Sequence, residues 1–169
     1  MGIVIRKYSE NDLGTMANIW NHVVKEGKYF PQIDVLSLKE ATAFFAEQTF
    51  TGVAEEDGVI VGLYILHPNN IGRCGHIANA SYAVAADQRG KRIGEKLVVH
   101  SLEMAKESGF RIMQFNAVVA DNKGRSAFIK SWVSRSWGPF REASKWTMVP
   151  LWISFRFILN CPQSRSNKG

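Results

Sequence analysis

The stretch that decides the fold is residues 84–97, which read Val84-Ala85-Ala86-Asp87-Gln88-Arg89-Gly90-Lys91-Arg92-Ile93-Gly94-Glu95-Lys96-Leu97. An apolar strand ends here, a short basic turn containing glycine follows, and a helix begins. The first N–H groups of a helix favour an anion because they lack internal acceptors and lie at the positive end of the helix dipole. Glycine permits close approach of a bulky group, and arginine can hold phosphate oxygens with two N–H groups. The turn predicts a phosphate site, although a solvated basic loop explains the same residues.

The spacing Arg89-x-x-Arg92-x-Gly94, placed between an apolar strand and Leu97, resembles the pyrophosphate-binding signature of the GNAT superfamily of acyl-CoA N-acyltransferases. That signature usually has Gln or Arg first, Gly at the position of Arg92, and Gly or Ala at the last position. An arginine at the middle position still allows the helix to start, but its Cβ could crowd the pyrophosphate. The stretch is no P-loop, because no Gly-Lys-Ser/Thr closes it.

The resemblance implies an α/β GNAT acyltransferase fold with a mixed, mostly antiparallel central sheet flanked by helices. It also implies acetyl-CoA as co-substrate and transfer of an acetyl group to a primary amine. In this family the pantetheine arm lies along the main chain of the strand before the turn, and the pyrophosphate lies on the amides of the turn. Asn122 matches the family's Asn after the fifth strand, and a turn-forming Asn is the alternative. The predicted cofactor-binding residues are Tyr82, Ala83, Val84, Arg89, Gly90, Lys91, Arg92, Ile93, Gly94 and Asn122.

Capping residues, hydrophobic periodicity and turn residues predict the remaining elements. In chain order they are a strand at 3–8, a helix between Ser9 and Gly27, a helix after Ser37, a hairpin around Asp57-Gly58, a strand at 76–84, a helix from Ile93 to Gly109 and a strand at 111–119. This order, β-α-α-β-β-β-α-β, resembles the GNAT core through its fifth strand. We therefore expect one domain at residues 1–123, followed by an atypical tail at 124–169 that is no independent domain.

The sequence assigns no catalytic residue. His76 is a candidate general base, and a hydrogen-bonded structural histidine is the alternative. The aromatic residues Tyr29 and Phe30 lie in a loop at 28–35, a region that commonly lines the acceptor pocket in the superfamily, and ordinary loop packing is the alternative. Cys74 and Cys161 have no metal-ligand spacing, so no metal is expected.

The tail departs from the family in composition and motif. Residues 1–122 hold 12 Lys and Arg against 14 Asp and Glu, whereas residues 123–169 hold 9 against 1, and four of the five tryptophans lie in the second segment. The family expects a helix with a Tyr that can protonate the coenzyme A thiolate, but no Tyr follows Tyr82. Because this Tyr is missing, the second candidate function is a catalytically impaired relic that binds acyl-CoA.

The genetic code suggests a cause for this departure. If the last base of each codon is read with the first two bases of the next, single-codon Trp and Met fix five residues: Gly from Trp132-Val133, Gly from Trp137-Gly138, Asp from Trp146-Thr147, Gly from Met148-Val149 and Asp from Trp152-Ile153. With permitted codons elsewhere, Phe128 onward reads Ile-Tyr-Lys-Lys-Leu-Gly-Phe, which resembles the expected ending. We therefore interpret residues from about 124 as a frameshifted segment. A divergent basic tail is the alternative.

The literal tail also lacks a clean strand pattern and holds three prolines, Pro139, Pro150 and Pro162. We therefore regard the last strands as doubtful and expect the fifth strand to lose its usual neighbours, which would leave an exposed edge.

Composition limits the partners. The net charge of +6 on 169 residues would ordinarily suggest nucleic acid, but the excess sits in the tail, so we expect no nucleic acid. No apolar run approaches the length of a membrane span, and we expect no membrane association. The third candidate function is a basic nucleic-acid-binding module. The expected location is the cytoplasm, the expected acceptor is a small-molecule or peptide amine, and a homodimer stays open.

Overall fold

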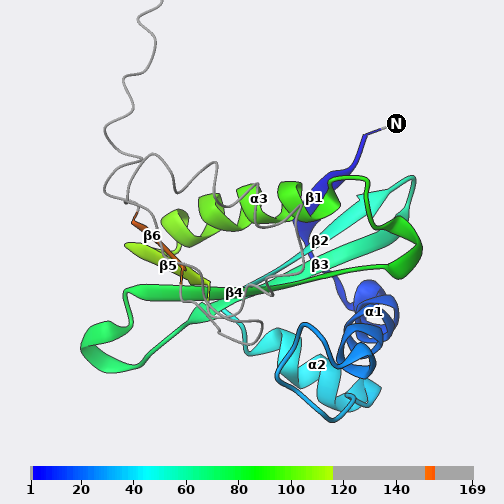
Figure 1. The fold of residues 1–169 in the computed structure, drawn as a ribbon, viewed down its shortest axis with the longest axis horizontal. Helices are drawn as coiled ribbons and strands as arrows, with labels where there is room; N and C mark the ends of the chain where they lie inside the picture. The colour runs from blue at the N-terminus through cyan, green and yellow to red at the C-terminus, as the bar shows by residue number, and fades with distance from the viewer. Residues whose placement is uncertain (1, 116–150, 155–169) are drawn as a thin grey trace, which may run out of the picture.

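The computed structural model describes residues 2–115 and 151–154, which form a mixed sheet between two layers of helices (Figure 1). The strands are β1 (Val4–Lys7), β2 (Phe50–Glu56), β3 (Val59–Pro68), β4 (Ile77–Val84), β5 (Ile112–Phe115) and β6 (Leu151–Ser154). The helices are α1 (Leu13–Glu26), α2 (Leu38–Ala46) and α3 (Ile93–Glu107), with short 3-10 turns η1 (Glu10–Asp12), η2 (Gly72–Cys74) and η3 (Ala86–Gln88).

The strands lie in the order β1-β2-β3-β4-β5-β6. All neighbouring pairs are antiparallel except β4 and β5, which run parallel and are joined through α3. A parallel pair needs such a crossover connection, because the end of the first strand and the start of the second lie at opposite ends of the two strands. The prediction of a mixed, mostly antiparallel sheet flanked by helices is confirmed.

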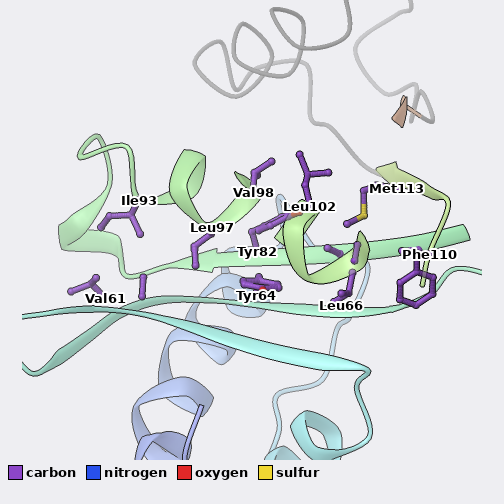
Figure 2. Close-up of a cluster of buried hydrophobic side chains, with 14 residues drawn as sticks. Val61, Tyr64, Leu66, Tyr82, Ile93, Leu97, Val98, Leu102, Phe110 and Met113 are labelled. Atoms are coloured by element: carbon purple, nitrogen blue, oxygen red, sulfur yellow. The ribbon is translucent and has the colours of Figure 1, made fainter. Parts of the chain in front are cut away.

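Each face of the sheet buries its own hydrophobic core. On one face, α3 covers a cluster that includes Tyr64, Tyr82, Leu97 and Leu102, and Figure 2 shows these side chains between the helix and the strands. On the other face, α1 and α2 cover a cluster built around Trp20. β4 lies inside the sheet and packs against a helical layer on each face.

Local sequence signals set the boundaries of these elements. Gly27 ends α1 in the left-handed conformation with φ of 63°. Ser37 caps α2, with its Oγ accepting from the Glu40 amide at 3.3 Å while the Glu40 carboxylate accepts from the Ser37 amide at 2.8 Å. Asp57 and Gly58 both have positive φ, 51° and 79°, as a type I′ hairpin turn requires. The predicted caps and hairpin are confirmed.

The expectation that the fifth strand has no further neighbour is wrong. Leu151–Ser154 forms β6 and pairs antiparallel with β5 over four residue pairs, from Ile112↔Ser154 to Phe115↔Leu151. Strand pairing is made by backbone groups, so a segment without a clean alternating pattern can still supply it. None of the three tail prolines lies inside β6, so no ladder donor is lost there. The rest of the tail lies outside the described residues.

Candidate functional site

The basic turn between β4 and α3 presents a run of backbone N–H groups. After η3 the chain turns through Gly90, with φ of 88°, and enters α3 at Arg92, with φ of 60°. Among the described residues, none of the amides at 89–95 donates a backbone hydrogen bond of good geometry, and the first such donor is Lys96, at 3.3 Å from the Arg92 carbonyl. These amides lie at the positive end of a 15-residue helix. The turn can therefore accept an anion without breaking its own structure.

The surface above the turn is open. A Cβ added at Gly90 or at Gly94 would meet no heavy atom within 4 Å. Ile93, the first residue of α3, instead has its side chain buried in the core, so it can offer an anion only its main chain. The predicted role of the two glycines, close approach of a bulky group to the backbone, stays a prediction that this open surface permits.

β4 pairs with a strand on each side. Its pairing with β3 continues to Val84, and its described pairing with β5 covers Ile77, Ala78 and Asn79, with β5 described only as far as Phe115. The amide of Ala85 donates to the Val61 carbonyl on β3 at 3.0 Å. Because main-chain groups of successive strand residues point to opposite sides, those of Val84 face the side on which β5 lies.

The same alternation separates the three predicted strand residues. Tyr82 and Val84 present their main chain to the β5 side, whereas Ala83 presents its main chain to Leu63 of β3. The Tyr82 side chain is buried under α3, with its hydroxyl 2.7 Å from Ser101 Oγ. Val84 and Tyr82 thus present main-chain groups on the β5 side and Ala83 on the β3 side, and the role of all three in cofactor binding stays a prediction.

The three basic side chains of the turn have different surroundings. The Arg89 guanidinium donates to both carboxylate oxygens of Glu26, Nη1 to Oε1 at 2.8 Å and Nη2 to Oε2 at 2.7 Å. Lys91 Nζ lies 3.4 Å from a carboxylate oxygen of Glu56. The Arg92 side chain is 80% exposed and reaches Glu95 only at 4.0 Å. Arg92, not Arg89, is therefore the cation of the turn best placed to meet an incoming phosphate.

The carboxylate that holds Arg89 was not singled out by the sequence. Glu26 ends α1 and lies 63 residues away along the chain. Hydrogen bonds from Arg89 hold the pKa of Glu26 below its usual value, and the same bonds raise the pKa of Arg89. A Glu in the last turn of a helix, where the dipole disfavours a negative charge, is a weak signal that a cation lies nearby.

Other candidate residues fall into structural roles or outside the described chain. The His76 Nδ1 lies 2.9 Å from the Arg73 carbonyl, a contact typical of a structural histidine. Phe30 packs on Trp20 with ring centroids 4.4 Å apart, whereas the Tyr29 ring lies under the Arg89 guanidinium at 5.9 Å. Asn122 lies outside the described residues, so its role stays a prediction.

A cluster of carboxamides where β4 pairs with β5 was also missed by the sequence. The Asn69 side chain donates to Gln114 Oε1 at 3.1 Å, and the Asn79 side chain donates to Asn69 Oδ1 at 3.4 Å.

In the described part of the chain, no group of three His, Cys, Asp or Glu side chains is placed to hold a metal ion. Among the helices that the structure describes, none has the length and apolar character needed to cross a bilayer.

The fold agrees with the comparisons to known proteins. The profile of the Acetyltransferase (GNAT) family matches residues 17–131, and the chain belongs to this family. The N-acetyltransferase aca1 of Schizosaccharomyces pombe is 29% identical over 134 residues, which cover 69% of this chain. The chain spans 64% of the length of that curated relative.

Solved structures show the same fold. A GCN5-related N-acetyltransferase from Kribbella flavida is 28% identical, with a TM-score of 0.70, and the match covers 77% of this chain and 80% of that one. The yncA protein of Salmonella typhimurium, solved with its cofactor acetyl-CoA, is 19% identical, with a TM-score of 0.71 and coverage of 78% and 79%. A phosphinothricin acetyltransferase from Sinorhizobium meliloti, in complex with acetyl-CoA, is 20% identical, with a TM-score of 0.71 and coverage of 78% and 74%.

Proposed function

We propose that the chain is an acetyl-CoA-dependent N-acetyltransferase that acetylates a primary amine of a small molecule or peptide. The observation that carries the proposal is the run of amides at 89–95, which have no backbone acceptor within the described residues and lie beside the end of β4. The named activity of the Schizosaccharomyces relative and the acetyl-CoA in two of the similar structures support it.

In this proposal the turn holds the diphosphate. The amides at 89–95 donate to phosphate oxygens, and the positive end of α3 favours the charge. The exposed Arg92 guanidinium adds a charge-assisted contact to a phosphate oxygen, and Lys91 adds a second positive charge nearby. The open surface over Gly90 and Gly94 leaves room for a group as large as a diphosphate. These residues bind and orient, and they take no part in bond making.

The strand then guides the arm toward the acceptor. From Val84 back to Asn79, five residues at about 3.3 Å each give about 17 Å, a length comparable with an extended pantetheine arm. The main-chain groups of Val84 face the side on which β5 lies. The bound thioester supplies an activated acetyl group. Residues near Asn79 would then orient the amine, and we assign no catalytic base.

We infer further that the residues from about 124 onward derive from a shifted reading frame. The five codon-determined residues support this, and so does the end of the family match at residue 131, shortly after the expected junction. The nucleotide sequence around codon 124 tests the inference. An insertion or deletion relative to close relatives is expected, and an intact frame through this region would refute it.

The missing Tyr favours a second candidate, a relic that binds acyl-CoA without turnover. Tyrosines occur only at positions 8, 29, 64 and 82, so the chain as written lacks the acid that the family uses for the leaving thiolate. Calorimetric titration with coenzyme A and a thiol-release assay over a panel of primary amines separate the two. Binding with turnover supports the enzyme, binding without turnover supports the relic, and absence of binding excludes both.

We also expect the protein to act in the cytoplasm, where an exposed free thiol such as that of Cys74 stays reduced. Cell fractionation tests this expectation, and recovery from a secreted or periplasmic fraction would contradict it. Whether the protein forms a homodimer stays open, and sedimentation velocity tests it.

A further inference from the structure

The Arg89 side chain joins the turn to a part of the protein that is remote in sequence. Its guanidinium makes two hydrogen bonds to Glu26, at 2.8 and 2.7 Å, and lies over the Tyr29 ring at 5.9 Å from the centroid. Both partners flank Gly27, where α1 ends and the loop to α2 begins. The arginine at the first signature position therefore contacts the α1–α2 loop, which we define as residues 27–37.

The pairing satisfies a charge that the helix alone disfavours. Glu26 is the last residue of α1, where the aligned peptide dipoles place partial negative charge. Its side chain is only 24% exposed, against 40% for Arg89, so water solvates this carboxylate incompletely. The two parallel N–H···O contacts match the geometry of guanidinium and carboxylate, and such pairs are more directional than a lysine contact.

The α1–α2 loop is held at several points. Near its end, the Asn21 side chain donates to the Leu36 carbonyl at 2.7 Å and accepts from the Leu36 amide at 2.8 Å. Near its start, Arg89 contacts Tyr29, and Phe30 packs on Trp20 with ring centroids 4.4 Å apart. Further along, the Ile33 side chain is 90% exposed. The start of the loop is thus held by Arg89 together with the packing of Phe30.

We propose that Arg89 is a positioning residue that links the anion-binding turn to the α1–α2 loop, and that it is not a phosphate ligand. An anion that orders the turn also orders the start of the loop, because the guanidinium holds both. By linkage, the ordered loop in turn favours anion binding. The coupling to coenzyme A binding rests on the proposed function, whereas the contact between Arg89 and Glu26 is present in the protein without any ligand.

Hydrogen exchange of the full chain tests the bridge without any ligand. Arg89→Gln and Glu26→Gln should each raise amide exchange at 27–30 by about twofold to fivefold, the range for an exposed pair of good geometry. Asn21→Ala is the matched control, because it releases the end of the loop near Leu36 and leaves the start fastened. Arg89→Lys should recover only part of the protection, since an ammonium cannot form the two-pronged contact.

Calorimetry with coenzyme A separates positioning from phosphate binding. Arg89→Gln and Glu26→Gln should change the dissociation constant by the same factor, about threefold or less, because both break the same bridge. Arg92→Gln should weaken binding about tenfold and reduce its salt dependence, as expected for a direct charge-assisted contact. In the unsubstituted protein, coenzyme A should slow exchange at 27–30, and in Arg89→Gln this effect should disappear.

Two results would overturn the proposal. One is unchanged exchange at 27–30 in both Arg89→Gln and Glu26→Gln, which would show that the pair does not hold the loop. The other is loss of coenzyme A affinity in Arg89→Gln as large as in Arg92→Gln, with no loss in Glu26→Gln, which would make Arg89 a ligand. If the unsubstituted protein binds no coenzyme A, the proposed function fails while the exchange experiment still decides the bridge. If Arg89→Gln does not fold, Glu26→Gln provides the same test.

Discussion

Arg92 is the residue at which this chain departs from the family signature, and its backbone makes the departure measurable. It has φ of 60° and ψ of 21°, the left-handed conformation, at the N-cap of α3. A residue with a Cβ loses roughly 1–2 kcal/mol in this conformation, and glycine does not. We therefore expect Arg92→Gly to unfold with a free energy about 1 kcal/mol higher than that of Arg92→Ala, since both variants lose the side chain and only one keeps the Cβ.

The comparison with alanine removes the electrostatic terms. The 4.0 Å contact with Glu95 involves a side chain that is 80% exposed, and both variants delete it equally. Urea unfolding monitored by circular dichroism gives the difference, and thermal unfolding should show a midpoint about 2–4 °C higher for the glycine variant. A glycine variant no more stable than the alanine variant would refute the assigned backbone conformation and with it the shape of the turn.

Three further substitutions test the surroundings of the turn and the core. Gly62→Ala places a Cβ 3.1 Å from the Ala83 carbonyl, and we expect a loss of about 1–3 kcal/mol in urea unfolding, so an unchanged midpoint would contradict the packing of β3 on β4. Tyr82→Phe removes a buried hydroxyl hydrogen bond and should lower the free energy of unfolding by about 1 kcal/mol by the same measurement, whereas a stabilised variant would show that the bond is absent. Hydrogen bonds from Arg6 lower the pKa of Asp12 to about 2 from 3.8, so its contribution of about 2 kcal/mol should be present above pH 4 and be lost as the pH falls from about 4 to about 2. Asp12→Asn should flatten that part of the pH–stability curve, and a curve of unchanged slope would disprove the pairing.

The sequence predicted those parts of the fold that depend on neighbouring residues. Ser37 with Glu40, Gly27, and Asp57 with Gly58 each act within a few positions, and each ends or starts the expected element. The order of strands and helices followed from periodicity and from the family resemblance. These signals are local, so a single sequence contains them.

The parts that the sequence could not reveal depend on residues far apart in the chain. The turn lies between β4 and α3 as expected, but the contact of Arg89 with Glu26 was not foreseen, and the binding role of Arg89 stays a prediction. Nothing within the turn itself reveals a carboxylate 63 residues away. The same limit applies to Ala83, because the side of the strand to which its main chain points depends on the register with β3.

The edge of the sheet was mispredicted for a related reason. Leu151–Ser154 follows β5 after a long stretch and lacks a clean alternating pattern, yet it pairs with Ile112–Phe115. Backbone pairing needs an available edge more than a particular side-chain pattern. Asn122 and the remainder of the tail lie outside the described residues and stay predictions.

The most direct test of the account is a titration of the ¹⁵N-labelled protein with coenzyme A, followed through its backbone amide resonances. We predict saturable downfield shifts of the amides at 89–95, as expected when an N–H acquires an anionic acceptor, and no comparable shifts with pantetheine, which lacks the diphosphate. Resonances at 89–95 that do not move while others do, or equal shifts with pantetheine, would contradict the assignment of this turn as the diphosphate site.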